Sequence, residues 1–156
     1  MHRNSLLLFE KYARLLYKQD QRLLEVGARR GQSAYRDSLA RTGQWMSYSF
    51  CDLSNKGANL DGFILCTEYR INTSDGCFDV VLSGQTIEHV RKPWRWVPEL
   101  ARVTKPGGLV ILISPVTWAV HRHPIDGWRI LPDGMAALFE DAGLTVELCQ
   151  MESLDK

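Results

Sequence analysis

Apolar positions recur at helical spacing in four stretches of the chain. In residues 5–19 they fall on one side, with charged side chains largely opposite, which predicts an amphipathic helix across the body of the domain. The same spacing predicts three more helices, which are residues 32–41, a segment that begins near Pro93, and residues 135–142. Proline suits the first turn of a helix, and the Lys-Pro-Gly-Gly sequence at residues 105–108 is expected to stop the third one.

Short apolar runs bounded by turn residues alternate with these helices and predict about six strands. Residues 109–113 (LVILI) contain no polar residue, which is typical of a central strand covered on both faces of a parallel sheet. The other predicted strands are residues 22–27, 45–50, 62–66, 78–83 and 145–149. Strands that alternate with helices predict an α/β domain on a doubly wound, mostly parallel sheet. No repeat or linker is evident, so residues 1–156 are expected to form a single domain.

Length and composition agree with one domain and narrow the choice of partners. The chain has 156 residues, of which 45% are hydrophobic, enough for one continuous core. It carries 19 Lys and Arg against 18 Asp and Glu, and this net charge of +1 gives no broad field for gripping a nucleic-acid backbone. We therefore expect a small-molecule partner and no nucleic acid.

Cysteine usage and the N-terminal sequence bear on location. The four cysteines are widely spaced and form no C-x-x-C pair, so they are interpreted as buried free thiols in a reducing compartment. The first residues do not resemble a secretory leader, and the longest apolar stretch, around residues 109–115, is too short to span a bilayer. These features predict a soluble, cytoplasmic protein with no membrane contact.

Ligands of open parallel sheets bind outside the carboxyl ends of the strands, so residues that follow a strand are the first candidates. Residues 25–31 (EVGARRG) lead into a helix, where glycine permits φ > 0 and the helix start offers free N–H groups. An ordinary turn would explain this sequence equally well. Asp52, about twenty residues further on, is placed to accept hydrogen bonds from two ribose hydroxyls, or to cap a helix that starts at Leu53.

A candidate catalytic group follows the predicted strand of residues 78–83. Glu88 and His89 would stand at the rim of the cleft. A histidine of near-neutral pKa there can take a proton from a substrate hydroxyl or amine, although a lone histidine is often structural.

Polar and aromatic side chains are dense in residues 118–133. Such density favours a substrate loop, assigned to residues 116–133, over a solvated loop that is pinned by its tryptophans. The His-x-His pair of His121 and His123 could join His89 around a metal ion. Because these histidines show no fixed ligand spacing, no metal site is expected.

Three stretches together resemble the class I S-adenosylmethionine-dependent methyltransferases. LLEVGARRG resembles the family's first motif, FDVVLSGQTIEHV its segment after the fourth strand, and ELARVTKPGGLVILISP the following helix and fifth strand. The likeness covers residues 23–144, and PIDGWRILPDGMAALFEDAGL looks like the type 11 branch, whose members often act on small metabolites, sugars or natural-product scaffolds. The resemblance implies a Rossmann-like fold, S-adenosylmethionine as cofactor and S-adenosylhomocysteine as product.

The resemblance also implies roles for individual residues. At the methionine end of the cofactor we expect Glu25, Gly27, Ala28 and Gly31, and at the ribose we expect Asp52 with Leu53. Thr67 or Glu68 is expected at the adenine edge, and Ser83 and Gln85 are expected at the sulfonium side. His89 is the expected catalytic residue, which removes the nucleophile's proton during an in-line displacement, with His121 or His123 in reserve. A helix over residues 1–20 is expected to cover the cleft. This helix and the substrate loop supply the expected substrate contacts, which are Tyr12, His121, His123, Asp126, Trp128 and Arg129.

Some features depart from the family pattern and leave alternatives open. Arg29 stands where the family has a second glycine, and Thr67 where an aspartate commonly caps the adenine amine. The usual seventh strand is missing, so the chain is either truncated or completed by a partner such as a second copy. These departures favour a non-catalytic methyltransferase-like domain for binding or dimerisation as an alternative to methyl transfer to an oxygen or nitrogen. A further alternative is an NAD-dependent oxidoreductase. Its G-x-G-x-x-G fingerprint fails here, because Arg29 and Gln32 occupy the second and third glycine positions.

Overall fold

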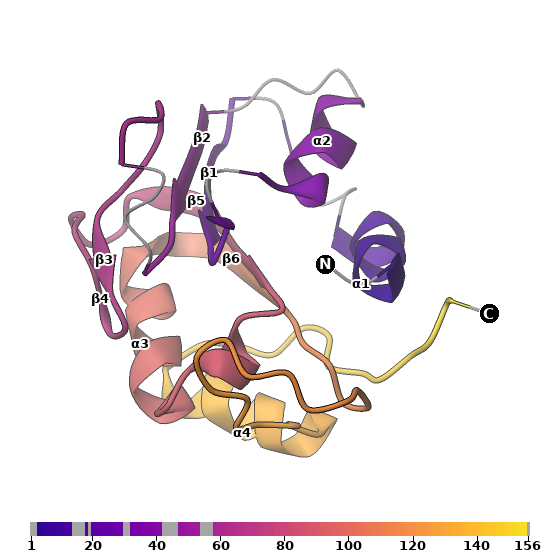
Figure 1. Cartoon of the computed structure of the whole chain (residues 1–156). Coiled ribbons are helices and arrows are strands. Elements are labelled where there is room, and N and C mark those ends of the chain that lie inside the picture. The colour runs from indigo at the N-terminus through magenta and orange to yellow at the C-terminus, as the bar shows by residue number, and fades with distance from the viewer. Residues whose placement is uncertain are drawn as a thin grey trace.

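The computed structural model describes residues 3–13, 18, 20–29, 32–41, 47–53 and 58–155. Its centre is a four-stranded sheet in the order β2-β1-β5-β6, in which all neighbouring pairs are parallel (Figure 1). The strands are β1 (Arg22–Val26), β2 (Ser47–Cys51), β5 (Phe78–Gly84) and β6 (Thr104–Ile113). The predicted α/β fold with a mostly parallel sheet is confirmed. Because the strands are parallel, their carboxyl ends lie along one edge of the sheet.

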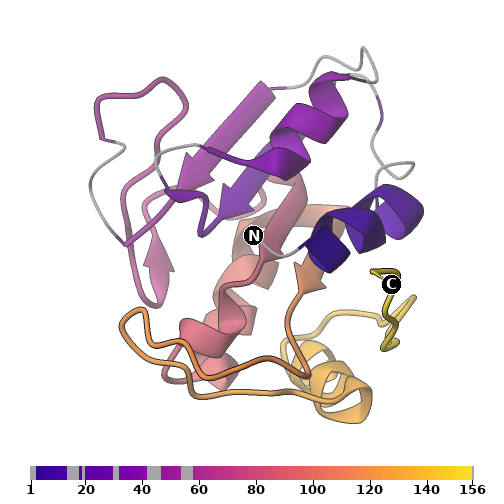
Figure 2. The ribbon, with the colours of Figure 1, turned by 45° about the vertical axis from the view of Figure 1, so that its right-hand side comes forward.

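Helices cover both faces of this sheet (Figure 2). One face carries α1 (Arg3–Leu8), the short π-helix η1 (Phe9–Ala13) and α2 (Ala34–Ala40), and the other carries α3 (Pro93–Val103) and α4 (Pro132–Asp141). Neighbouring strand residues point to opposite faces. Leu23 therefore packs in one core with Phe9, whereas Leu24 packs in the other with Leu100.

Local sequence explains where the predicted helices begin and end. The Ser33 hydroxyl accepts hydrogen bonds from Tyr35 N and Arg36 N at 3.1 and 3.2 Å, which caps α2. Pro93 occupies the first turn of α3, as predicted, and this helix ends at Val103, directly before β6. The N-terminal helix is confirmed over residues 3–13, whereas Lys18 near its predicted end is not helical. Residues 14–17 and 19 of the predicted range lie outside the described residues.

Two strand predictions are wrong in the described structure. Residues 145–149 alternate in polarity but form no strand with any described residue, because alternation along one segment cannot supply a hydrogen-bonding neighbour. Residues 109–113 belong to a strand at the end of the sheet rather than at its centre, and all five are half-buried. An apolar run shows that both faces are covered, and it does not show that both edges are paired.

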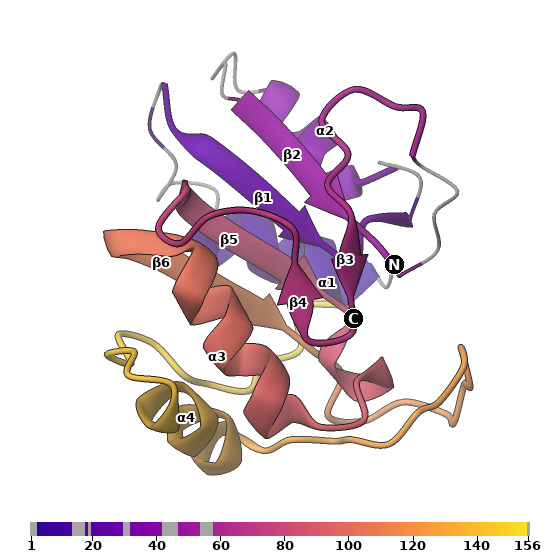
Figure 3. The ribbon, with the colours of Figure 1, turned by 90° about the vertical axis from the view of Figure 1, so that its left-hand side faces the viewer.

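The predicted strand over residues 62–66 is only partly formed. Phe63 makes a single parallel bridge with Phe50 of β2. The chain then enters an antiparallel hairpin of β3 (Cys66–Thr67) and β4 (Arg70–Ile71), which lies beside α3 (Figure 3).

Membrane and cysteine expectations can be compared with the same residues. None of the described helices has the length and apolar character needed to cross a membrane. Cys51 is buried, whereas Cys66, Cys77 and Cys149 are half-buried, so full burial holds for one of the four thiols.

Candidate functional site

The turn after β1 is held against the segment after β5. Gly27 has a φ of +92°, and its amide donates to Cys51 O at 2.8 Å. A Cβ at this position would overlap Oγ1 of Thr86 and lie 3.0 Å from its Cγ2, so only glycine fits. Ala28 is buried and Arg29 is exposed, so the arginine in place of the family's second glycine does not fill the turn. Gly31 lies outside the described residues.

Glu25 is a buried carboxyl one residue before the end of β1. Its Oε2 accepts a hydrogen bond from the Tyr48 hydroxyl of β2 at 3.0 Å. Burial raises the pKa of Glu25 to about 7, and hydrogen bonds from Ser33 and Tyr48 and the charge of Arg36 offset part of that rise. A cationic group placed beside Glu25 would favour its charged form.

The segment at the end of β5 and just after it holds one buried side-chain oxygen that is left without a partner among the described residues. The Ser83 hydroxyl donates to Val26 O at 2.7 Å, so this side chain ties β5 to β1. Gln85 has a φ of +58°, and its amide and Nε2 both donate to Ile113 O, at 2.8 and 3.4 Å. Gln85 Oε1 is buried and has no hydrogen-bond partner among the described residues. A donor from a ligand would satisfy it.

The predicted ribose residues follow β2, and the predicted adenine residues lie in the β3–β4 hairpin. Asp52 comes directly after β2 and is half-buried, and Leu53 is exposed. Thr67 is also exposed, with its hydroxyl 3.5 Å from Arg70 O across the hairpin. Glu68 Oε1 accepts from Arg91 N at 2.7 Å, which fastens the hairpin to the segment before α3.

The 3₁₀-helix η5 (Ile87–His89) carries the predicted catalytic histidine. His89 Nδ1 lies 2.5 Å from Ile125 O, and His89 Nε2 lies 3.9 Å from Glu88 Oε1. Glu88 is fully buried, and neither carboxylate oxygen has a hydrogen-bond partner among the described residues. This burial raises the pKa of Glu88.

An internal ion pair organises the predicted substrate loop. Asp126 accepts two hydrogen bonds from the Arg129 guanidinium, at 2.5 and 2.7 Å, and a third from His121 N at 2.8 Å. Arg129 holds the pKa of Asp126 well below its usual range. Asp126 and Arg129 thus satisfy one another and shape the loop.

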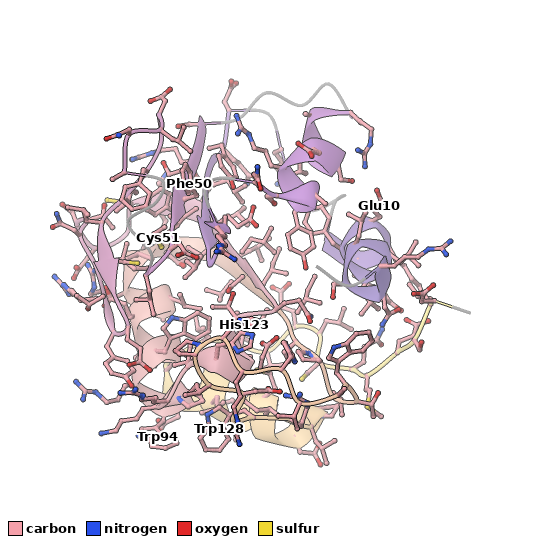
Figure 4. All side chains as sticks on the ribbon, in the orientation of Figure 1. Glu10, Phe50, Cys51, Trp94, His123 and Trp128 are labelled. Carbon is pink, nitrogen blue, oxygen red and sulfur yellow. The ribbon has the colours of Figure 1, made fainter. Side chains whose placement is uncertain are left out.

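The loop is also fastened to η5 and α3. Gly127 N donates to Glu88 O at 2.8 Å, and Trp128 Nε1 donates to Val90 O at 2.8 Å. Trp128 meets Trp94 edge-on, with ring centroids 5.8 Å apart, at the foot of the molecule in Figure 4. These contacts bring the side of the loop that bears His121 against His89, with ring centroids 5.0 Å apart.

His123 and Tyr12, two further predicted substrate contacts, have surroundings of their own. His123 lies 6.5 Å from His121 between ring centroids and close to the middle of the view in Figure 4. Tyr12 bonds through its hydroxyl to Glu152, and it lines a groove of about 930 Å³ between β6, α4 and residues 144–151. Thus the hydroxyl of Tyr12 is joined to the C-terminal segment, and the groove that Tyr12 lines also includes Val116 and Ile130 of the substrate loop.

Sequence reasoning weighed His89 with His121 and His123 as metal ligands and rejected them, and it did not include Glu88 in that grouping. One potential ligand atom from each of Glu88, His89 and His121 lies within 4.8 Å of the others. The adjacent Glu-His pair and the His-x-His pair were the available signals. Their convergence depends on the loop path between them, which the sequence spacing does not show.

Comparisons with known proteins agree with this geometry. The family described as "Methyltransferase domain" matches residues 24–112. An "Uncharacterized methyltransferase" of Mycolicibacterium gilvum is 42% identical over 56 residues, which is 36% of this chain and 22% of that protein's length. The chain thus spans about a fifth of that curated relative.

Two solved structures share the fold. A SAM-dependent methyltransferase from Aquifex aeolicus is 19% identical with a TM-score of 0.62, over 86% of this chain and 78% of that one. The [4+2]-cyclase SpnF is 23% identical with a TM-score of 0.65, over 89% of this chain and 55% of that one. At these identities the likeness is one of fold alone.

Proposed function

The chain belongs to the methyltransferase domain family of class I, S-adenosylmethionine-dependent enzymes, and from this premise we propose that it transfers a methyl group from S-adenosylmethionine to an oxygen or nitrogen of a small molecule. The observation that carries the proposal is the buried Oε1 of Gln85, which has no hydrogen-bond partner among the described residues. Gln85 stands between Ser83, which bonds to Val26 O, and Thr86, which contacts Gly27. An acceptor oxygen is therefore left open beside the glycine turn.

The residues present fit the cofactor. S-adenosylmethionine supplies an activated methyl group when bound. Glu25, with a pKa of about 7, gains a partner for its charged form in the cofactor's α-ammonium group. We assign Gly27 and Ala28 to the methionine end, because Gly27 bends the backbone at a positive φ next to the end of β5. Asp52 then serves the ribose, with Leu53 beside it.

Assignments further along the cleft follow from position. Thr67, on the hairpin, is our candidate for the adenine edge, because Glu68 already accepts a hydrogen bond from Arg91 N. Ser83 supports the sulfonium side through its bond to β1 rather than by direct contact. Gly31 keeps its predicted role without a described position.

We propose that the acceptor molecule binds between η5 and the substrate loop, residues 116–133. Exposed apolar side chains on this loop, Trp118 and Val120, offer contact area to a small molecule, with His121 and His123 beside them. Alignment and exclusion of water would supply most of the rate enhancement, because the sulfonium is already an activated leaving group. The role of His89 as proton acceptor and that of Tyr12 as a substrate contact remain predictions.

We also propose that a second copy pairs with the outer edge of β6. This strand ends the sheet, and no other strand among the described residues lies beyond it. Light scattering on the purified chain should then give the mass of a dimer. A monomer at every concentration would contradict this assembly and leave the methyl-transfer proposal unaffected. A cytoplasmic location remains a prediction from cysteine usage.

Calorimetry with S-adenosylhomocysteine tests the proposal, with NAD as the control ligand. We expect the whole chain to bind S-adenosylhomocysteine and not NAD. Gln85→Ala should weaken that binding by about tenfold, because the ligand would lose one hydrogen bond. A folded chain that binds no S-adenosylhomocysteine would refute the proposal in favour of a non-catalytic binding domain. Transfer of label from methyl-labelled S-adenosylmethionine to a panel of alcohols and amines then identifies the acceptor class.

A further inference from the structure

We propose that Glu88, His89 and His121 bind a divalent transition-metal ion at the carboxyl end of β5. One potential ligand atom from each residue lies within 4.8 Å of the others. Two imidazoles and one carboxylate are ligands that Zn²⁺ and related first-row ions accept. The three residues come from η5 and from the loop above it, 32 positions apart along the chain.

A cation is favoured beside the buried carboxylate of Glu88. The Glu88 side chain is 0% exposed, and both carboxylate oxygens lack a hydrogen-bond partner among the described residues. A buried carboxylate is costly unless a charge or a hydrogen bond compensates it. The cations nearby are engaged elsewhere, since Arg129 forms a two-bond pair with Asp126. A bound cation would give both Glu88 oxygens a partner.

Oxygen atoms of the protein lie against Nδ1 of both imidazoles, on the side away from the proposed ion. His89 Nδ1 faces Ile125 O at 2.5 Å, and a carbonyl can only accept, so Nδ1 carries the proton and Nε2 carries the lone pair. That Nε2 faces Glu88 Oε1 at 3.9 Å. His121 Nδ1 lies 3.1 Å from Ala119 O and 3.3 Å from Asp126 Oδ2. Metal-binding histidines are held in this way by a carbonyl or carboxylate on the outer nitrogen.

The spacing of the three ligand atoms is close to the spacing around one bound metal ion. Metal bonds to histidine nitrogen and to carboxylate oxygen are about 2.0–2.2 Å long, so two ligand atoms of one ion lie at most about 4.3 Å apart. The 3.9 Å between Glu88 and His89 already satisfies this limit. For His121 a shift of the loop by less than about 1 Å suffices. Three protein ligands leave a coordination position open, as in catalytic sites.

The place of the cluster suggests what the open position would hold. Glu88 follows Thr86 by two residues, and Thr86 contacts Gly27 at the glycine turn. If the proposed function is correct, the open position would hold the acceptor oxygen or nitrogen beside the methyl donor, and His89 would act as a ligand rather than as a proton acceptor. Metal binding itself does not depend on that function.

Zn²⁺ binding to tag-free, chelator-stripped protein tests the site. We expect one equivalent of Zn²⁺ by equilibrium dialysis. Glu88→Gln and His121→Ala should each weaken it by at least about 100-fold, because loss of an outer-shell partner alone costs 10–100-fold. His123→Ala is the matched control and should change affinity less than about threefold, since His123 lies outside the cluster. Co²⁺ should give a visible spectrum without the thiolate charge-transfer band of a cysteine site.

Each other outcome overturns the inference. Failure of the wild-type chain to bind Zn²⁺, retention of Zn²⁺ by Glu88→Gln and His121→Ala, or a thiolate band with Co²⁺ would each do so. Calorimetry with S-adenosylhomocysteine on the same variants separates this result from the proposed function. Variants that keep cofactor-product binding while the wild-type chain binds no metal would remove the metal site and leave the methyltransferase proposal intact.

Discussion

Gly27 and Thr86 touch across the ends of two neighbouring strands. Gly27 begins the turn after β1, and Thr86 follows β5 by two residues. The Thr86 hydroxyl also lies 3.4 Å from Val26 O and 3.3 Å from Gly84 O, so it bridges both strand ends. The floor of the proposed cofactor site is therefore a packed junction, in which one missing Cβ lets the two segments meet.

Gly27→Ala should damage both this junction and cofactor binding. The new Cβ would overlap Thr86 Oγ1 at a φ of +92°, and together these effects should lower the free energy of unfolding by about 3 kcal/mol. Affinity for S-adenosylhomocysteine should fall by at least about tenfold, because the turn must move. Urea unfolding and calorimetry measure the two effects.

Gly143→Ala is the control for backbone strain alone. Gly143 has a φ of +77°, and an added Cβ there meets nothing within 4 Å. The Gly143→Ala substitution should lower the free energy of unfolding by about 1 kcal/mol and leave the affinity for S-adenosylhomocysteine unchanged. An unchanged affinity in a folded Gly27→Ala protein would show that the cofactor does not lie over this turn.

Glu25 should make stability fall as the pH rises toward neutrality. Its pKa is raised from 4.5 to about 7 in the folded chain, so the folded state holds this proton more tightly than the unfolded state. The associated stabilisation is complete below pH 4.5 and is lost as the pH rises through about 7, by about 3 kcal/mol in all. Urea unfolding at pH 5 and pH 8 gives the change.

Glu25→Gln provides the comparison, because glutamine keeps an oxygen for the Tyr48 hydroxyl and cannot ionise. The difference between the two proteins isolates Glu25 from every other titrating group. Parallel loss of stability in both proteins between pH 5 and pH 8 would mean that Glu25 ionises at its ordinary pKa.

Elements whose burial is decided locally were predictable from sequence. Residues 78–83 are a strand because their apolar run fits only a buried position, and Ser33 and Pro93 mark helix starts through their own chemistry. The prediction of a strand over residues 145–149 was wrong because a strand also needs a hydrogen-bonding neighbour. Whether such a neighbour is present depends on how the rest of the chain folds.

The candidate site divides along the same line. The glycine turn and Asp52 follow strands and were found by position. The pairing of Asp126 with Arg129 and the approach of His121 to Glu88 depend on how a long loop folds back, which residue spacing does not determine. That the buried Glu88 carboxylate has no hydrogen-bond partner in the described part of the chain is likewise visible only in three dimensions.

Arg102→Lys should destabilise the junction between α3 and the β3–β4 hairpin. The Arg102 guanidinium donates to both Glu99 oxygens at 2.6 and 2.8 Å, to Thr73 O and Ile71 O at 3.0 Å, and to Asp75. A lysine ammonium cannot span these acceptors, and the loss should be about 1–3 kcal/mol. Thermal and urea unfolding check this, with the exposed Arg95→Lys on the same helix as control. Equal stability of the two variants would contradict a structural role for the network.

Asp126→Asn should loosen the substrate loop and weaken the proposed metal site together. Asp126 accepts from the Arg129 guanidinium and from His121 N, and it lies 3.3 Å from His121 Nδ1. Hydrogen exchange should show faster exchange of the His121 amide, which donates to this carboxylate. Zn²⁺ affinity should fall by about 10–100-fold through the misplaced imidazole, a smaller loss than that of His121→Ala.

Asp133→Asn, on the first turn of α4, is the matched control for removal of one negative charge. It should leave both the exchange of the His121 amide and Zn²⁺ affinity unchanged. Faster exchange in Asp126→Asn with wild-type Zn²⁺ affinity would mean that His121 reaches the ion without support from Asp126. Slow exchange in Asp126→Asn would instead show that Trp128 Nε1 on Val90 O and Gly127 N on Glu88 O suffice to fasten the loop.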